Sequence, residues 1–357
     1  MTETGRLTDR SVPSRRTVLS TLGAGAAAAA IGSPPIPALA QAGAGGLNLK
    51  KLPKSDQVLP QIGLGTYLTF DVLPGKPRSH LREVMRRFYE GGGRVVDTSP
   101  LYGMSEISVG DFASAMGVTD ELFITNKVWT TGEFLGDDSH ARRSLEQSTQ
   151  RLWRETIDVM QVHSLVNVDI MVPLLNAWKR DGRIRHVGVT HHELPYFPAL
   201  AQWVERGEID FVQVHYSIHT RQAEDRILKA AADRGIAVLV NMPFEKARLF
   251  KIAEGRPLPD FAREIGADNW AQFYLKWVIS HPAVTCAIPA TTNPDHMSQN
   301  IGALKGPLPD AAMRARMVKH METIPGFDTL AQMASYPDKE FSGAVRPPRR
   351  PAQTGRT

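Results

Sequence analysis

Residues 157–190 read IDVMQVHSLVNVDIMVPLLNAWKRDGRIRHVGVT and contain one complete repeat of a simple pattern. A short apolar run at 157–163 is followed by a helical pattern at 170–181 and a second β-branched run at 184–190. Gly182 comes directly after the helical pattern, where a left-handed cap is favoured. Two such runs joined by a helix predict a β-α-β unit, in which the two strands are parallel.

The same alternation continues on both sides of this unit. The other expected strands are 59–66, 94–98, 122–127, 210–216, 236–242 and 284–288. The other expected helices are 79–91, 104–116, 138–153, 195–206, 221–234, 268–281, 294–304 and 309–322, with Asp268 as an N-cap. Eight strand–helix units within residues 41–326 predict an α/β fold, a (β/α)8 TIM barrel. The alternative is a doubly wound open sheet, but no GxGxxG motif follows the first strand.

The composition excludes several classes of protein. The chain has 357 residues, of which 42% are hydrophobic and 22% charged, so it can bury a sizeable core. Its one cysteine, Cys286, excludes a disulfide framework and a CxxC zinc site, and we expect it to be a buried small residue. No His, Asp and Glu cluster with metal-ligand spacing is present, so no metal is predicted.

The N-terminal 40 residues have the order of a secretory signal. Arg15 and Arg16 precede a mild apolar stretch at 18–31, and Ala38 and Ala40 precede a plausible cleavage point. We therefore predict a twin-arginine signal peptide over 1–40, with export by the twin-arginine machinery to the periplasm. A disordered Ala-rich segment is the alternative. The apolar stretch is short and interrupted by glycine, so no stable membrane span is predicted after cleavage.

The C-terminal residues 327–357 are rich in Pro and Arg, and we predict a mobile, disordered tail there. A basic anchor to anionic surfaces is the alternative reading. The formal net charge of +5 lies largely in the two ends, which carry net +2 each, so nucleic-acid binding is not predicted. No heptad seam is visible in the outer helices, which favours a monomer.

Four polar side chains fall at or just after the ends of consecutive predicted strands. These residues are Asp97, Tyr102, Lys127 and His163. In a (β/α)8 barrel the carboxyl ends of the strands meet at one mouth, where the chemistry takes place. Each residue taken alone is weak evidence, because strand ends commonly carry solvated or turn-forming residues. Their coincidence on three neighbouring strands predicts a catalytic site.

These segments resemble the aldo/keto reductase superfamily. Residues 97–106, DTSPLYGMSE, are similar to its Asp-x4-Tyr-Gly-x-Ser-Glu signature, and the segments at 123–128, 160–163, 182–189, 210–214 and 288–290 follow in family order. The resemblance implies an oxidoreductase that transfers hydride from NAD(P)H to a small aldehyde or ketone. It implies that Tyr102 donates the proton and that Lys127 lowers the pKa of this tyrosine. Asp97 would keep Lys127 charged, and His163 would polarise the carbonyl oxygen.

The resemblance also implies a cofactor site for NADP(H) or NAD(H). The implied cofactor contacts are Gly65, Thr66, Thr190, His191, Gln213, Asn241, Pro243, Ala290, Thr291, His296, Gln299 and Asn300, and the implied substrate contacts are Tyr67 and Trp129. Members that prefer NADP(H) usually carry Lys or Arg after the eighth strand. Residues 290–300 have neither, so the preference stays open.

The implied cofactor shell departs from the family at three places. The pair Thr190-His191 replaces the usual Ser-Asn, and Asn241 stands where an aromatic residue often stacks on the nicotinamide. Glu245 would repel a phosphate if its side chain points inward, although Lys246 and Arg248 could offset this. These departures keep a second hypothesis open, a non-catalytic nicotinamide-nucleotide-binding or scaffold protein.

A third hypothesis is a Schiff-base lyase that uses Lys127 as the amine. Asp97 argues against it, because a carboxylate beside the lysine favours the protonated, non-nucleophilic form.

Export also bears on the hypothesis of a nicotinamide-dependent reductase, since twin-arginine transport carries folded proteins. We therefore predict that the protein binds its nucleotide before export and retains it.

Overall fold

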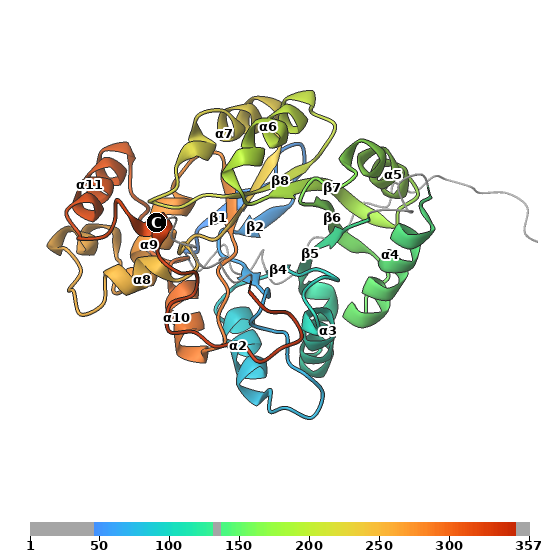
Figure 1. The fold of residues 1–357 in the computed structure, drawn as a ribbon, viewed down its shortest axis with the longest axis horizontal. Helices are drawn as coiled ribbons and strands as arrows, with labels where there is room; N and C mark the ends of the chain where they lie inside the picture. Colours follow the sequence, from blue (N-terminus) through green and yellow to red (C-terminus); the bar gives the residue numbers. More distant parts are fainter. Residues whose placement is uncertain (1–45, 131–136, 348–357) are drawn as a thin grey trace, which may run out of the picture. The chain divides into compact units, whose positions relative to one another are not determined.

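The computed structural model describes residues 46–130 and 137–347 (Figure 1). The predicted signal peptide at 1–40 and the last ten residues lie outside the described residues. Eight parallel strands form one sheet in the order β10-β9-β8-β7-β6-β5-β4-β3. They are β3 (Leu64–Gly65), β4 (Val95–Asp97), β5 (Phe123–Val128), β6 (Ile157–His163), β7 (Ile184–His191), β8 (Phe211–His215), β9 (Ala237–Asn241) and β10 (Val284–Ala287). The predicted (β/α)8 barrel is confirmed.

The two edges of this sheet meet and close the barrel. Parallel bridges join Ile62 to Ala287 and Gly65 to Ala290, and the amide of Gly63 donates to the Ala287 carbonyl at 2.8 Å. An ideal Cβ at Gly65 would lie 2.8 Å from the Ile288 carbonyl oxygen, so a larger residue would push the closing strands apart. Glycine is therefore required where the first and last strands approach.

The first predicted strand, 59–66, is divided in the structure. Its beginning belongs to an antiparallel hairpin of β1 (Leu49–Lys51) and β2 (Val58–Pro60), and only Leu64–Gly65 continues as the barrel strand β3. Leu52 and Leu59 of the hairpin pack in the same buried cluster as the barrel residues Val95 and Phe123. The prediction of one strand over 59–66 was wrong. An apolar run can pack against the end of a barrel as well as form one of its strands, and hydrophobicity alone does not separate the two.

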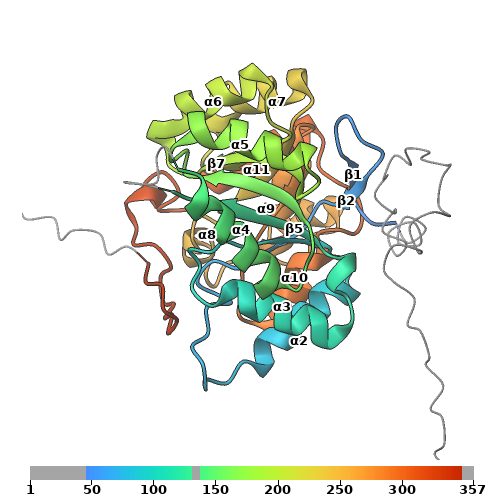
Figure 2. The same cartoon turned by 90° about the vertical axis from the view of Figure 1, so that its right-hand side faces the viewer.

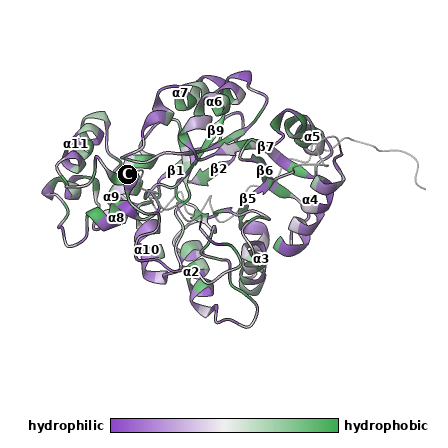
Figure 3. Cartoon of the chain, in the orientation of Figure 1, coloured by the Kyte–Doolittle hydropathy of each residue, from purple (hydrophilic) through white to green (hydrophobic). Residues whose placement is uncertain are grey.

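Helices alternate with the strands and surround them (Figure 2). They are α2 (Ser79–Glu90), α3 (Ser105–Met116), α4 (Ser139–Leu152), α5 (Val168–Arg180), α6 (Phe197–Arg206), α7 (Ile227–Arg234), α8 (Arg248–Ile252), α9 (Trp270–Ile279), α10 (Pro294–Gly302) and α11 (Ala311–Glu322). The α4 helix buries Ala141, Leu145 and Leu152 and turns a hydrophilic face outward (Figure 3). No helix among the described residues is long and apolar enough to cross a membrane.

Two local helix predictions need correction. The cap of α9 is Asn269, whose side chain accepts a hydrogen bond from the amide of Gln272, whereas the Asp268 amide donates to the Gln272 side chain. This reciprocal arrangement places the cap one residue later than predicted. The predicted helix 221–234 is a 3-10 turn at Gln222–Glu224 followed by α7, so the boundary again lies further along the chain.

The C-terminal residues differ from the predicted mobile tail over 327–347. Leu330 is fully buried and Phe327 is 6% exposed, with its ring 5.2 Å from that of His219. The amide of Tyr336 donates to the Lys246 carbonyl at 2.8 Å. We call residues 327–347 the C-terminal strap. Its apolar residues are spaced too irregularly to reveal this packing in a Pro- and Arg-rich sequence.

Candidate active site

Strand alternation directs three of the predicted catalytic residues into the barrel. Phe123, Thr125 and Lys127 share one face of β5, and Phe123 belongs to the buried cluster inside the barrel. The register pairs Asp97 with Thr125 and His163 with Thr190 on the neighbouring strands. Asp97, Lys127 and His163 therefore point inward near the carboxyl end of the sheet, as the sequence predicted.

Asp97 and Lys127 form a buried ion pair. The Lys127 Nζ lies 2.7 Å and 2.8 Å from the two Asp97 oxygens and 2.9 Å from the Thr98 carbonyl, and Lys127 is 1% exposed. Burial lowers the pKa of Lys127, and the charge of Asp97 opposes that shift. Three acceptors around one nitrogen match the three protons of an ammonium ion. The arrangement is therefore unfavourable for an amine nucleophile.

Tyr102 lies directly beside this pair. The Lys127 Nζ is 4.9 Å from the centre of the Tyr102 ring, and the rings of Tyr67 and His163 lie at 5.0 Å and 5.8 Å. Among the described residues the Tyr102 hydroxyl has no hydrogen-bond partner. Burial, followed by the negative charge of Asp97, raises the pKa of Tyr102 well above its usual value.

The net shift of the Tyr102 pKa is therefore upward, against the expected lowering by Lys127, because burial is the largest effect. The lysine directs its protons to Asp97 and Thr98, and burial disfavours the tyrosinate. Tyr102 is consequently a neutral phenol at neutral pH, which is the form that carries a proton to donate.

His163 is held as a neutral imidazole. Burial, together with the nearby charge of Lys127, lowers the pKa of His163 to about 3. Its Nδ1 lies 3.3 Å from the Ser99 hydroxyl oxygen, which already accepts a hydrogen bond from the Leu101 amide. We assign Ser99 as the donor to Nδ1, an assignment that places the ring proton on Nε2. Sequence reasoning did not single out Ser99, although it lies inside the signature segment.

The side-chain amides of Gln161 and Gln213 form another part of the buried site. The Gln161 side chain donates to the Gln213 side-chain oxygen at 2.9 Å, and Gln213 reaches the Asp97 carboxylate at 3.5 Å. The predicted cofactor residue Thr190 is paired with Gln213 on adjacent strands. The Gln161 side-chain oxygen has no hydrogen-bond partner in the described part of the chain. It is available to a ligand donor.

His191 is not brought into this group. It follows Thr190 on β7 and so projects to the opposite side of the strand. Its ring stacks on Tyr196 with centres 3.9 Å apart, and its Nδ1 accepts from the Glu193 amide at 3.1 Å. His191 and Tyr196 instead line a groove of about 590 Å³ between α5 and α6.

Glu245 is satisfied by groups within the protein. Its carboxylate lies 2.7 Å from the His215 Nε2 and also accepts from the Ser217 hydroxyl, and Glu245 is 2% exposed. Burial raises the pKa of Glu245, but the hydrogen bond and charge of His215 outweigh this and bring the pKa to about 2. The carboxylate of Glu245 is thus turned toward His215 and Ser217. His215, which faces inward on β8, was missed because no strand-end motif marks it.

The other predicted cofactor residues occupy the rim between β9, β10 and β3. Asn241 ends β9, with a buried side-chain oxygen that has no partner within the described ranges, and Pro243 is buried just after it. Thr66 donates its hydroxyl to the Asp97 carbonyl at 2.9 Å. Gly65 lies against Ala290, where the strands close.

The helix α10 begins beside this rim. Asn293 caps it, and the Thr291 hydroxyl accepts from the Asn293 amide at 3.0 Å. Arg87 of α2 reaches the first turn and pairs with Asp295 at 2.6 Å. His296 and Gln299 are exposed on this helix and Asn300 is buried, so the three do not form one surface. Of the two predicted substrate residues, Tyr67 contacts Tyr102 and Trp129 is half-buried.

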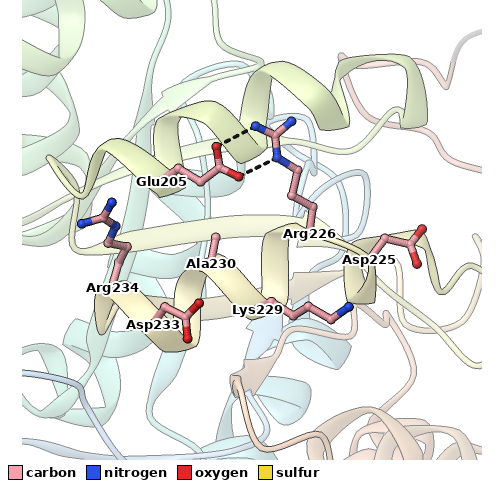
Figure 4. A pocket seen from close by; sticks show the side chains of 7 residues that line it. All are labelled: Glu205, Asp225, Arg226, Lys229, Ala230, Asp233 and Arg234. Atoms are coloured by element: carbon pink, nitrogen blue, oxygen red, sulfur yellow. Dashed lines mark hydrogen bonds and ion pairs between the residues drawn. The ribbon is translucent and has the colours of Figure 1, made fainter.

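Surface depressions elsewhere do not compete with this site. A depression of about 450 Å³ between α6 and α7 is lined by charges of both signs, with Glu205 paired to Arg226 (Figure 4). The stick view shows Lys229 and Arg234 directed away from that pair. Over residues 46–130 and 137–347, no three His, Cys, Asp or Glu side chains gather as metal ligands.

Comparison with known proteins supports the assignment of the barrel. Residues 61–319 match the Aldo/keto reductase family. The chain belongs to the aldo/keto reductase family. This reductase is 24% identical over 320 residues to the NADH-specific methylglyoxal reductase of Escherichia coli (strain K12), which covers 74% of this chain and 96% of the relative.

Solved structures show the same fold as this reductase. An aldo/keto reductase from Klebsiella pneumoniae in complex with NADP and acetate has a TM-score of 0.62 and 24% identity, covering 77% of this chain and 95% of that one. The holo form of an aldo-keto reductase from Bacillus halodurans has a TM-score of 0.62 and 21% identity, covering 76% and 96%. A nicotinamide cofactor of either type fits this membership.

The residues of this reductase also fit such a cofactor. The unpartnered side-chain oxygens of Gln161 and Asn241 are hydrogen-bond acceptors suited to a carboxamide N–H. The N-terminus of α10, where the helix dipole favours an anion, is suited to a phosphate.

Proposed function

We propose that this protein reduces small aldehydes or ketones with NAD(P)H, using Tyr102 as the proton donor. The observation that carries the proposal is the buried Asp97–Lys127 pair next to Tyr102 and the neutral His163. When bound, the nicotinamide supplies a hydride to the carbonyl carbon. The protein must then supply one proton and stabilise the charge that develops on the carbonyl oxygen.

The four side chains divide this work. Tyr102 is protonated at neutral pH, and because its pKa is raised it releases the proton only to a strongly basic oxygen. Lys127 lies 4.9 Å from the centre of the Tyr102 ring, close enough for its positive charge to favour the tyrosinate as the proton leaves. Asp97 holds Lys127 in that place through two hydrogen bonds.

His163 contributes a hydrogen bond to the substrate. With Nδ1 accepting from Ser99, its Nε2–H is the group free to donate to a carbonyl oxygen. A neutral donor stabilises the developing negative charge without competing with Tyr102 as an acid. These roles resemble those that the sequence motifs imply. The difference is that burial raises the pKa of Tyr102, whereas the motifs implied a pKa lowered by Lys127 before the substrate binds.

The test is NAD(P)H oxidation over a panel of carbonyl compounds. Methylglyoxal belongs in the panel because a relative is a methylglyoxal reductase. Tyr102→Phe should lower kcat by about 10²- to 10⁴-fold, the range for a general acid. Tyr196→Phe is the matched control, since Tyr196 is 48% exposed and stacks on His191 outside the barrel. No turnover with any carbonyl, or full activity of Tyr102→Phe, would contradict the proposal.

A second candidate is a non-catalytic nucleotide-binding protein. It is favoured by Asn241, which offers no aromatic face to a nicotinamide, and by the outward placement of His191. A fluorescence titration with NADH and NADPH separates the two candidates. Tight binding without turnover of any carbonyl favours the second one, and the same titration gives the cofactor preference.

We also propose that residues 1–40 direct the folded protein to the periplasm through the twin-arginine pathway, as a monomer that retains its nucleotide. Support comes from the Arg15-Arg16 pair and the small residues before residue 41. Replacing both arginines with lysine should leave the protein in the cytoplasmic fraction. Mass spectrometry of the exported protein should find bound nucleotide, and protein that emerges empty would refute its retention.

A further inference from the structure

A buried carboxylate, Asp71, joins the catalytic turn to the C-terminal strap. Asp71 is 3% exposed and lies in the loop that follows β3. One of its oxygens contacts the turn that carries Tyr102, and the other contacts residues 343–345 of the strap. We propose that Asp71 is a positioning residue, which sets the place of Tyr102 and makes that place depend on the strap being closed.

We call Asp71 with its contacts to the Tyr102 turn and to residues 343–345 the clasp. The first half of the clasp holds the turn that carries Tyr102. Asp71 Oδ1 accepts from the amide of Met104 at 2.9 Å. Gly103 has φ +59° and lies so close that an ideal Cβ there would be 2.2 Å from the same oxygen. Since Met104 caps α3, the carboxylate also lies at the N-terminus of that helix.

The second half of the clasp acts on the strap. Asp71 Oδ2 accepts from the amide of Val345 at 2.7 Å, and Gly343 packs directly on the carboxylate. The strap is also fastened at the β9–α8 loop, where Tyr336 bonds Lys246. It therefore runs from the loop after β9 to the loop after β3, past the strand β10 that lies between them (Figure 1).

The position of Tyr102 depends on this turn more than on its own hydroxyl. The hydroxyl has no hydrogen-bond partner among the described residues, so backbone contacts of the turn and the packed rings place the side chain. A displacement of about 1 Å at a reacting group can cost a factor of about 10² in rate. A single side chain that holds both the turn and the strap therefore links closure of the strap to the proton donor.

This inference rests on the proposed reductase activity for its kinetic part. Its structural part does not, because the coupling can be measured by hydrogen exchange of the full-length protein. The relevant peptides cover residues 102–108 and 339–346. An exposed contact, Lys251 to Asp338 at 2.9 Å, attaches the strap elsewhere and provides a control.

Four variants test the clasp. Asp71→Asn places an N–H group against one of two backbone N–H donors, so that contact is lost. Val345→Pro removes only the strap's donor, and Val345→Ala is its matched control because it keeps the amide. Asp338→Asn removes only the exposed contact with Lys251 and leaves the contacts of Asp71, and with them the closed strap, in place.

Asp71→Asn should lower kcat by about 10-fold or more, with a smaller change in the KM of the carbonyl. Val345→Pro should speed exchange in both peptides and lower kcat in the same direction, whereas the two controls stay within about twofold of the parent. If Val345→Pro frees the strap but leaves exchange at 102–108 and kcat unchanged, the coupling is refuted. An equal fall of kcat in Asp338→Asn would also overturn it. Without turnover in the parent protein the proposed function fails, and exchange alone decides the coupling.

Discussion

The barrel has two walls that follow their sequence motifs to different degrees. On the catalytic wall, β4 to β6, Asp97, Lys127 and His163 all point inward and stand within one group. On the nucleotide wall, β7 to β9, Thr190 and Gln213 point inward, but His191 stacks outside on Tyr196. The two walls differ in which side of a strand each residue occupies: Asp97, Lys127 and His163 hold inward positions, whereas His191 follows the inward Thr190 and so takes the outward position.

The two walls also differ in whether their buried polar side chains have partners within the protein. The catalytic wall holds one ion pair, and its phenol and imidazole stay neutral through burial. The nucleotide wall leaves side-chain oxygens without partners at Asn241 and on its border at Gln161. These two unpartnered oxygens are acceptors that a bound ligand could use.

The largest expected effect comes from breaking the ion pair of the catalytic wall. Lys127→Met leaves the buried Asp97 charge unpaired and should lower the free energy of unfolding by about 3–5 kcal/mol. The double variant Asp97→Asn with Lys127→Met removes both charges and should recover most of that loss. Urea unfolding at pH 7 measures both, and a double variant as unstable as the single one would contradict a dominant role for the unpaired charge.

Glu245→Gln tests the nucleotide wall. The change weakens the buried contacts to His215 and Ser217, and it should cost about 1–3 kcal/mol of stability at pH 7. Because the pKa of Glu245 is lowered to about 2, this difference should persist above pH 4.5 and shrink as the pH falls toward 2. Nucleotide affinity should stay within about threefold, about 0.7 kcal/mol. A clear gain in affinity would mean that the carboxylate faces the phosphates after all.

The neutral His163 predicts a pH dependence of stability. Its pKa is about 3 in the folded protein against 6.5 as the ordinary value, so the unfolded chain binds more protons between these pH values. Stability should therefore fall as the pH drops below 6.5, by up to about 1.4 kcal/mol per pH unit from this residue. His163→Gln should flatten the slope of unfolding free energy between pH 6 and pH 4. An unchanged slope would place the His163 pKa near its ordinary value.

The smallest expected effect concerns the orientation of that imidazole. Ser99→Ala removes the hydroxyl that donates to Nδ1, and it should lower kcat about fivefold, equivalent to about 1 kcal/mol. Ser108→Ala is the control, since Ser108 is buried on α3 and its hydroxyl has no partner within the described residues. Steady-state kinetics of both variants gives the answer, and equal effects would remove the special role of Ser99.

Much of the fold could be predicted from the sequence because its repeats are local. Eight strand–helix units are visible in hydrophobic periodicity alone, and the barrel follows from their number. The split of 59–66 into β2 and β3 was not visible, because Leu59 is equally apolar whether it lines the barrel or plugs its end. Likewise Asn269, not Asp268, caps α9, since both residues are good caps by type.

The candidate site likewise has features that could be predicted from the sequence and features that could not. Asp97, Lys127 and His163 could be predicted to converge because parallel strands and a period of two residues determine where each points. The partner of Glu245 could not be predicted. His215 lies 30 residues earlier, at the end of β8, and contacts Glu245 only because β8 and β9 are neighbours in the sheet. The contacts of the C-terminal strap were likewise unpredictable, because Asp71 and Val345 are 274 residues apart.

By itself, the sequence determined the barrel, its family and the residue types available for hydride and proton transfer, because these depend on local periodicity and short motifs. Only the tertiary structure decided the protonation of Tyr102 and His163, the outward turn of His191, and the clasp at Asp71. The physical reason is that burial and long-range pairing set the charge and position of a side chain, and both depend on which distant segments fold around it.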